Sequence, residues 1–196
     1  MKKLGKHGAR SDAAAMEPPA SARMRREPNP FWRVSLQTYR LPGVEAACLA
    51  LQDACATDTN LLLYCGWLGA EGRALDQRML RRAMAAVARL QGEAILPLRQ
   101  VRRALKAASP ELPDGWTADL RKRIGAVELD LEYLEQCVLV QQARNLPPQK
   151  RRLAPRAATQ LSITRYLTLL AIPPAAVEWQ HIVTLLDACF AAPPSN

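Results

Sequence analysis

The stretch Asp58–Leu68, which reads DTNLLLYCGWL, decides the fold of this 196-residue chain. It begins with Asp and Thr, residue types that favour the N-cap of a helix, and continues with apolar side chains at almost every position. A helix that is apolar nearly all round is normally enclosed by other helices. We therefore expect a central helix over 58–69, ended by Gly69 and Gly72.

The sequence on both sides of this stretch predicts further helices. Ala and Leu, the strongest helix formers, supply much of the apolar content, aromatic residues make up only 5% of the chain, and no run alternates with the period of a strand. The expected helices cover about 30–39, 42–55, 75–90, 92–107, 117–144, 159–171 and 174–191. The fold class is thus all-α, a single helical bundle of about six to eight helices around the central one.

Local signals refine two of these helices. Asn29 and Pro30 suit the cap and first position of a helix, and Pro97 must either start a new helix or kink the existing one because it lacks an N–H. In the longest expected helix, apolar residues recur with 4-3 spacing, which predicts a packing seam. The seam consists of Leu120, Ile124, Val127, Leu131, Leu134 and Val138.

Composition and charge divide the chain into four parts. Residues 1–28 are predicted to be a disordered basic tail and 29–145 the helical core domain, followed by a linker over 146–158 and a C-terminal helical pair over 159–192. The pair either packs on the core or forms an appendage. Lys and Arg outnumber acids by seven to three in residues 1–27 but by only fifteen to thirteen in 28–146, so the net charge of +9 belongs mainly to the flanks.

Several classes of protein are excluded by what the sequence lacks. No apolar run approaches the ~18–20 residues of a membrane span, and the five cysteines form no metal or disulfide spacing, which favours buried, reduced thiols in a cytoplasmic protein. With only two histidines and no phosphate-loop, dinucleotide or serine-elbow motif, the sequence favours a protein without a metal, a cofactor or catalysis.

Four polar residues interrupt the central apolar helix on one face. Asn60, Tyr64, Trp67 and Glu71 follow each other with 4-3-4 spacing. They predict either the polar lining of a small-ligand pocket or a satisfied hydrogen-bond network that reaches solvent at the helix end. The satisfied network is the simpler interpretation.

A basic stripe in the helix around Pro97 is the second candidate site. Arg99 and Arg102, together with Arg103 and Lys106, suit an anion or acidic-partner site. The alternative is structural pairing with the acidic stripe Glu128, Glu132 and Glu135 of the following antiparallel helix. We favour mutual pairing, in which Arg99 and Arg102 approach Glu128.

Several segments also resemble a known family in the same order along the chain. They are Asn29–Trp32, Tyr39, Pro42–Val44, Cys48–Asp53, Asp58–Leu68, Pro97–Arg102 and Glu128–Leu129. Over roughly 29–140 the chain resembles an uncharacterised proteobacterial family, domain of unknown function 2390. The resemblance implies a bacterial α-helical domain, and it transfers no catalytic residue. The family pattern places an aromatic residue shortly before Pro97, where this chain has Leu90-Gln91.

These observations predict a helical protein-interaction or regulatory module whose partner is another protein, with self-association left open. The alternative is a small-ligand-binding protein or enzyme that uses Asn60, Tyr64, Trp67, Arg99 and Arg102. A third interpretation is weak nucleic-acid binding through the basic tails, which the lack of aromatic residues there disfavours.

Overall fold

The computed structural model describes residues 27–107, 115–149, 151–173 and 179–190. Within these ranges it is all-α and contains no strand, as the sequence predicts. The helices are α1 Pro30–Tyr39, α2 Val44–Cys55, α3 Thr59–Ala70, α4 Gln77–Leu90, α5 Leu96–Ala104, α6 Trp116–Arg144, α7 Pro155–Leu169 and α8 Trp179–Phe190. None of the described helices is both long and apolar enough to cross a membrane.

The central position predicted for the apolar stretch is confirmed for α3. Almost all of its side chains are buried, and it contacts α1, α2, α6, α7 and α8. Asp58 caps it, because its Oδ1 accepts a 2.8 Å hydrogen bond from the backbone N–H of Asn60. Asn29 caps α1 in the same way, accepting from the N–H of Trp32 at 3.0 Å. Both caps were readable from the sequence because capping is local.

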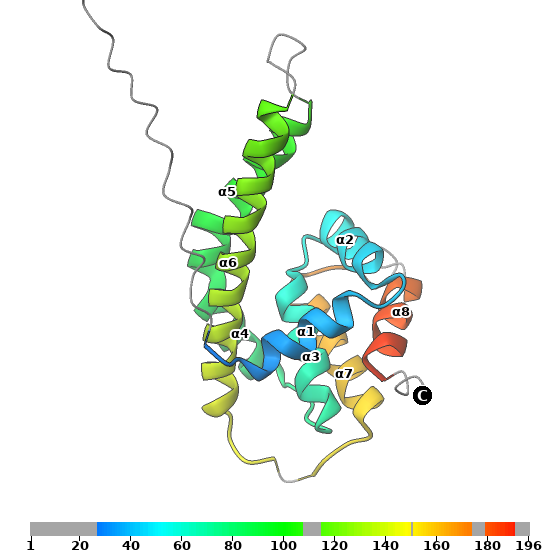
Figure 1. Cartoon of the computed structure of the whole chain (residues 1–196). Helices are drawn as coiled ribbons and strands as arrows, with labels where there is room; N and C mark the ends of the chain where they lie inside the picture. The colour runs from blue at the N-terminus through cyan, green and yellow to red at the C-terminus, as the bar shows by residue number, and fades with distance from the viewer. Residues whose placement is uncertain (1–26, 108–114, 150, 174–178, 191–196) are drawn as a thin grey trace, which may run out of the picture.

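The α5–α6 pair projects from the rest of the molecule as a helical hairpin (Figure 1). A π-helical turn, Gln91–Ile95, joins α4 to α5 without a break, and Pro97 lies in the first turn of α5 directly after it. At ~1.5 Å per residue, the 29 residues of α6 span roughly 43 Å, so its C-terminal half packs on the body while its N-terminal half extends beyond it.

The prediction that the 4-3 seam forms the buried face of α6 is wrong. Leu120, Val127 and Leu134 of the seam are 41–49% exposed. The fully buried positions of α6 are Glu128, Tyr133, Glu135, Gln136, Leu139 and Val140. Among the described elements, only α5 and the turn that follows it accompany the N-terminal half of α6, and two helices can bury only a narrow stripe. The face that meets α3 is instead largely polar.

The C-terminal helices are part of the body. Helix α7 packs on α3, and α8 packs on α2 and α3 (Figure 1). Helix α7 begins at Pro155, earlier than the 159 expected, because proline is favoured at the first helical position. The segment between α6 and α7 is anchored at Gly72, whose carbonyl oxygen accepts a 2.9 Å hydrogen bond from the backbone N–H of Leu153. Gly72 has φ +73°, and a Cβ there would lie 2.6 Å from the Leu153 carbonyl oxygen.

Candidate functional site

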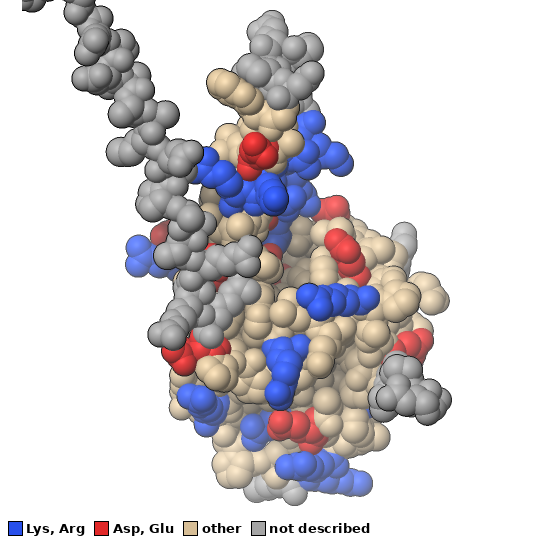
Figure 2. Space-filling view, in the orientation of Figure 1, with Lys and Arg blue, Asp and Glu red and all other residues tan. Residues whose placement is uncertain are grey.

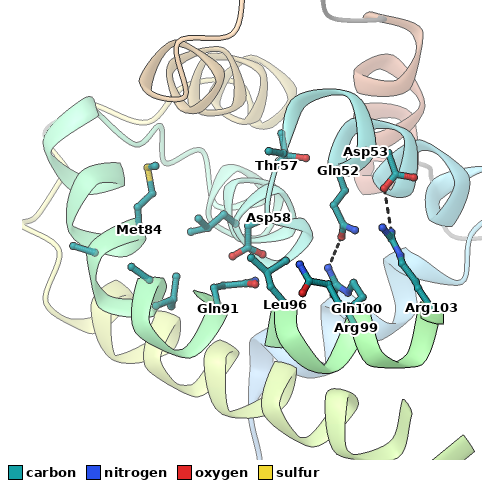
Figure 3. A pocket seen from close by; sticks show the side chains of 15 residues that line it. Gln52, Asp53, Thr57, Asp58, Met84, Gln91, Leu96, Arg99, Gln100 and Arg103 are labelled. Atoms are coloured by element: carbon teal, nitrogen blue, oxygen red, sulfur yellow. Dashed lines mark hydrogen bonds and ion pairs between the residues drawn. The ribbon is translucent and has the colours of Figure 1, made fainter. Parts of the chain in front are cut away.

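A cleft lies between α2 and α5. It has an α4-side chamber with a volume of about 580 Å³ and an α6-side chamber of about 440 Å³. Both chambers are lined by Gln52, Asp53, Asp58, Arg99 and Arg103, so they are two halves of one cleft. The N-terminal end of α3 forms the floor (Figure 3).

Two side-chain bridges cross this cleft and separate its chambers. Arg99 Nη1 donates to Gln52 Oε1 at 2.6 Å, and Arg103 Nη2 donates to Asp53 Oδ1 at 3.1 Å. The two arginines lie one turn apart on α5, and their partners are neighbours on α2 (Figure 3). The bridges therefore connect α2 and α5 across the cleft.

The α4-side chamber combines an apolar wall with a few polar groups. Its apolar lining comes from Ala56, Leu61, Met84, Ala85, Val87, Ala88 and Leu96. Two of its polar atoms, Thr57 Oγ1 and Asp58 Oδ2, are buried, and Thr57 Oγ1 has no hydrogen-bond partner in the described part of the chain. Ligand pockets of roughly 300–1,000 Å³ typically have this make-up.

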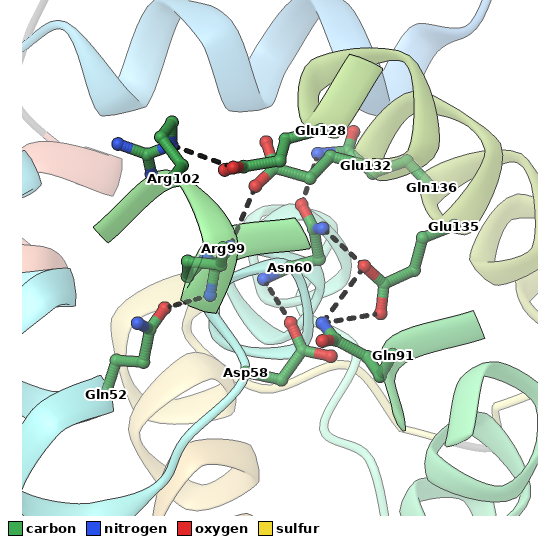
Figure 4. A network of polar contacts seen from close by, with 10 residues as sticks. All are labelled: Gln52, Asp58, Asn60, Gln91, Arg99, Arg102, Glu128, Glu132, Glu135 and Gln136. Carbon is green, nitrogen blue, oxygen red and sulfur yellow. Dashed lines mark hydrogen bonds and ion pairs between the residues drawn. The ribbon is translucent and has the colours of Figure 1, made fainter. Parts of the chain in front are cut away.

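The α6-side chamber is polar, and its back wall is a set of paired charges. Arg99 Nη2 binds Glu132 at 2.9 Å, and Arg102 Nε binds Glu128 at 2.8 Å (Figure 4). The mutual pairing of the two stripes is thus confirmed, although Arg99 meets Glu132, one turn beyond the predicted Glu128. The side chain of Arg99 is only 15% exposed, so this pair is largely shielded from water.

A buried hydrogen-bond network lies beneath the floor of the cleft (Figure 4). Asn60 Nδ2 donates to Glu135 Oε2 at 2.7 Å, and Asn60 Oδ1 accepts from Gln136 Nε2 at 2.7 Å. Gln91 Nε2 donates to both oxygens of Glu135 at 3.1 and 3.2 Å, and Ser35 donates to Gln136 at 3.0 Å. The network joins α1, α3, the π-helical turn and α6.

Glu135 is fully buried and has no cation beside it. Burial, together with the nearby Asp58 carboxylate, raises the pKa of Glu135 to about 9. At neutral pH Glu135 is therefore protonated, and its proton can be shared with Asp58. Asp58 belongs to the cleft floor, so the Glu135 proton lies directly behind that floor. The backbone N–H of Asp58 donates a hydrogen bond to the hydroxyl oxygen of Tyr166 in α7 at 2.9 Å.

Three of the six predicted site residues lie together at the cleft. Asn60, Arg99 and Arg102 all line the α6-side chamber. Asn60 is 6% exposed and takes part in the network described above.

The other three lie away from the cleft, because their face of α3 runs from the floor toward the opposite end of the helix. Tyr64 and Trp67 pack with Phe31, with ring centroids 5.8 and 5.1 Å from it. Glu71 is exposed just beyond the end of α3. The sequence did not reveal that Gln52 and Gln91 belong to the site, or that the Glu135 carboxyl is buried behind it. No local pattern connects segments that lie this far apart in the chain.

The thiols contribute no reactive group to the cleft. Burial raises the pKa of Cys48 to about 12 and that of Cys189 to about 11, and it raises the pKa of Cys65 as well. In the described part of the chain, no three His, Cys, Asp or Glu side chains are placed to hold a metal ion.

Fold and site together define an all-α domain with a bridged, two-chambered cleft above a protonated carboxyl pair. The chain belongs to the family of proteins of unknown function DUF2390, whose model matches residues 30–139. Every residue that lines either chamber lies within this range, whereas α7 and α8 lie outside it. Comparison with curated proteins and with solved structures gave no significant match.

Proposed function

We propose that this protein binds a small organic molecule in the cleft between α2 and α5. The observation that carries the proposal is Thr57, whose Oγ1 is buried in the wall of the α4-side chamber without a partner among the described residues. A buried polar atom without a partner costs free energy, and a ligand donor would remove that cost.

The rest of the cleft supports the same function. The amide of Gln91 and the hydroxyl of Thr57 also line the apolar α4-side chamber, so polar groups converge on an otherwise apolar space. A group with a strongly shifted pKa, Glu135, lies directly behind the floor. Shifted pKa values and apolar pockets with convergent polar groups are both typical of binding sites. The favoured ligand has an apolar body and a hydrogen-bond donor.

A pair of tryptophan substitutions on α4 tests the proposal. Ala88 lines the α4-side chamber, whereas Ala86, also exposed on α4, lines neither chamber. In a ligand-observed NMR screen of small amphipathic fragments, we expect Ala88→Trp to remove signals that wild type and Ala86→Trp both retain. If both variants unfold at the wild-type temperature and no fragment binds Ala86→Trp but fails to bind Ala88→Trp, the proposal that this chamber binds a ligand is wrong.

A second candidate is a protein-interaction module, which the hairpin surface favours. Val101, Leu120, Val127 and Leu134 expose between 41 and 49% of their surface on α5 and α6. An exposed apolar stripe of this kind is a common docking surface. If it joins two copies of the chain, Val127→Asp combined with Leu134→Asp should reduce the sedimentation coefficient to that of a monomer. A wild type that already sediments as a monomer at all concentrations contradicts self-association through this stripe.

A further inference from the structure

Cations and acids line the α6-side chamber in equal number, but two of the cations are left outside the ion pairs that the described residues form. Its lining includes five cations, Arg99, Arg102, Arg103, Lys106 and Arg121. Among the described residues, three of them have ion-pair partners: Arg99 with Glu132, Arg102 with Glu128 and Arg103 with Asp53. Lys106 and Arg121 form no ion pair with any described residue.

Arg121 is the most unusual of these groups. Its Nε is buried and has no acceptor among the described residues, although guanidinium N–H groups are strong donors that are seldom left unsatisfied. Arg102 of α5 lines the same chamber as Arg121. Its Nε donates to Glu128, and its two terminal nitrogens have N–H groups that remain available as donors. The described structure thus holds unused donors from two helices around one space.

The surface shows the same concentration of charge. Lys and Arg side chains gather over the α5–α6 hairpin and border the hollow between it and α1–α2 (Figure 2). Three of the five acids that line the chamber are paired, Glu128 with Arg102, Glu132 with Arg99 and Asp53 with Arg103. Their charges are therefore largely balanced, which weakens their repulsion of an incoming anion.

We propose that Arg102, Lys106 and Arg121 form a subsite for an oxyanion, a phosphate or carboxylate group of the molecule that the cleft binds. The forked guanidinium groups match the planar geometry of such oxygens, and the Lys106 ammonium adds a flexible point charge. This inference rests on the proposed function, and it defines the ligand as a molecule that carries an anionic group.

Titration with simple anions tests the subsite. The backbone amide signals of Gly125 and Glu128 are followed by NMR as inorganic phosphate or acetate replaces chloride at constant ionic strength. We expect saturable shifts with at least one of the two anions, and the stronger of them identifies the source of the oxyanion. The expected loss for Arg121→Gln is roughly tenfold or more in affinity, as for removal of one charge-assisted hydrogen bond.

Arg123→Gln is the matched control, because Arg123 is exposed on the same helix and does not line the chamber. It should leave the affinity unchanged. Equal losses in the two variants, or shifts that do not saturate, would show only general screening of a basic surface and would overturn the subsite. Fragment binding that depends on Ala88 would then still stand, so the two proposals fail separately.

Discussion

At the scale of single residues, the most consequential side chain is Glu135. A carboxyl group with no exposed surface and no neighbouring cation is stable in the fold only when it is protonated. Its three hydrogen bonds from Asn60 and Gln91 orient it, and Asp58 keeps its proton in place.

Because the buried Glu135 carboxyl is protonated, the free energy of unfolding depends on pH. The unfolded chain loses the Glu135 proton near its ordinary pKa of 4.5, whereas the folded protein keeps it up to about pH 9. The folded state therefore binds more protons in between, and the free energy of unfolding should fall as pH rises through this window, by at most about 1.4 kcal/mol per pH unit. Glu135→Gln should flatten this decline in urea unfolding measured from pH 5 to pH 9. An equally steep decline in the variant would assign the effect to other groups.

Asp58 serves α3 with one oxygen and the cleft with the other, and substitutions separate the two roles. Asp58→Ala removes the cap and should lower the free energy of unfolding by about 1 kcal/mol. Asp58→Asn keeps an oxygen for the N–H of Asn60 and should cost less, while it changes the group that faces the cleft. Chemical denaturation compares the two directly, and equal losses would show that the cap contributes little.

At the scale of elements, α6 shows how a correct helix can be assigned the wrong buried face. Its length and helical character followed from local sequence, but the direction of its 4-3 seam depends on which helices surround it. The C-terminal half meets α3 through Glu135 and Gln136, and the N-terminal half meets only the α5 region.

This assignment makes a stability prediction for α6. Val127→Gln, at a position that is 49% exposed, should change the free energy of unfolding by less than about 1 kcal/mol. Leu139→Ala, at a position with no exposed surface, should lower it by roughly 2–5 kcal/mol. Thermal or urea unfolding of both variants distinguishes the observed face from the predicted seam, which requires the larger loss at Val127.

At the scale of the whole molecule, the C-terminal helices complete the core beyond the limits of the family match. Leu185 of α8 has no exposed surface and belongs to the same apolar cluster as Leu62 of α3. Leu185→Ala should therefore lower the free energy of unfolding by roughly 2–5 kcal/mol in a single cooperative transition. Gln180→Ala, on the exposed face of α8, is the control and should have little effect. A separate, earlier transition for the C-terminal helices would show that they form an appendage.

The helices, the caps at Asn29 and Asp58 and the central place of α3 could be predicted because propensity, capping and apolar periodicity are local. The charge pairing of α5 with α6 was also predictable, since a short connection makes the two helices antiparallel. The cleft was not, because it is formed by Gln52, Asp58 and Arg99 from segments that meet only in the tertiary fold. Nor could burial of Glu135 be predicted, since charged residue types are rarely buried.

The bridge between Arg99 and Gln52 has a thermodynamic consequence for the cleft. Both chambers contain the same two side chains, so an occupant of either chamber that displaces the hydrogen bond between Arg99 and Gln52 changes the wall of both chambers. The amide of Gln52 then becomes available to the other chamber. Affinities in the two chambers are thereby linked, and the linkage is reciprocal: whatever factor the first occupant applies to the second, the second applies to the first.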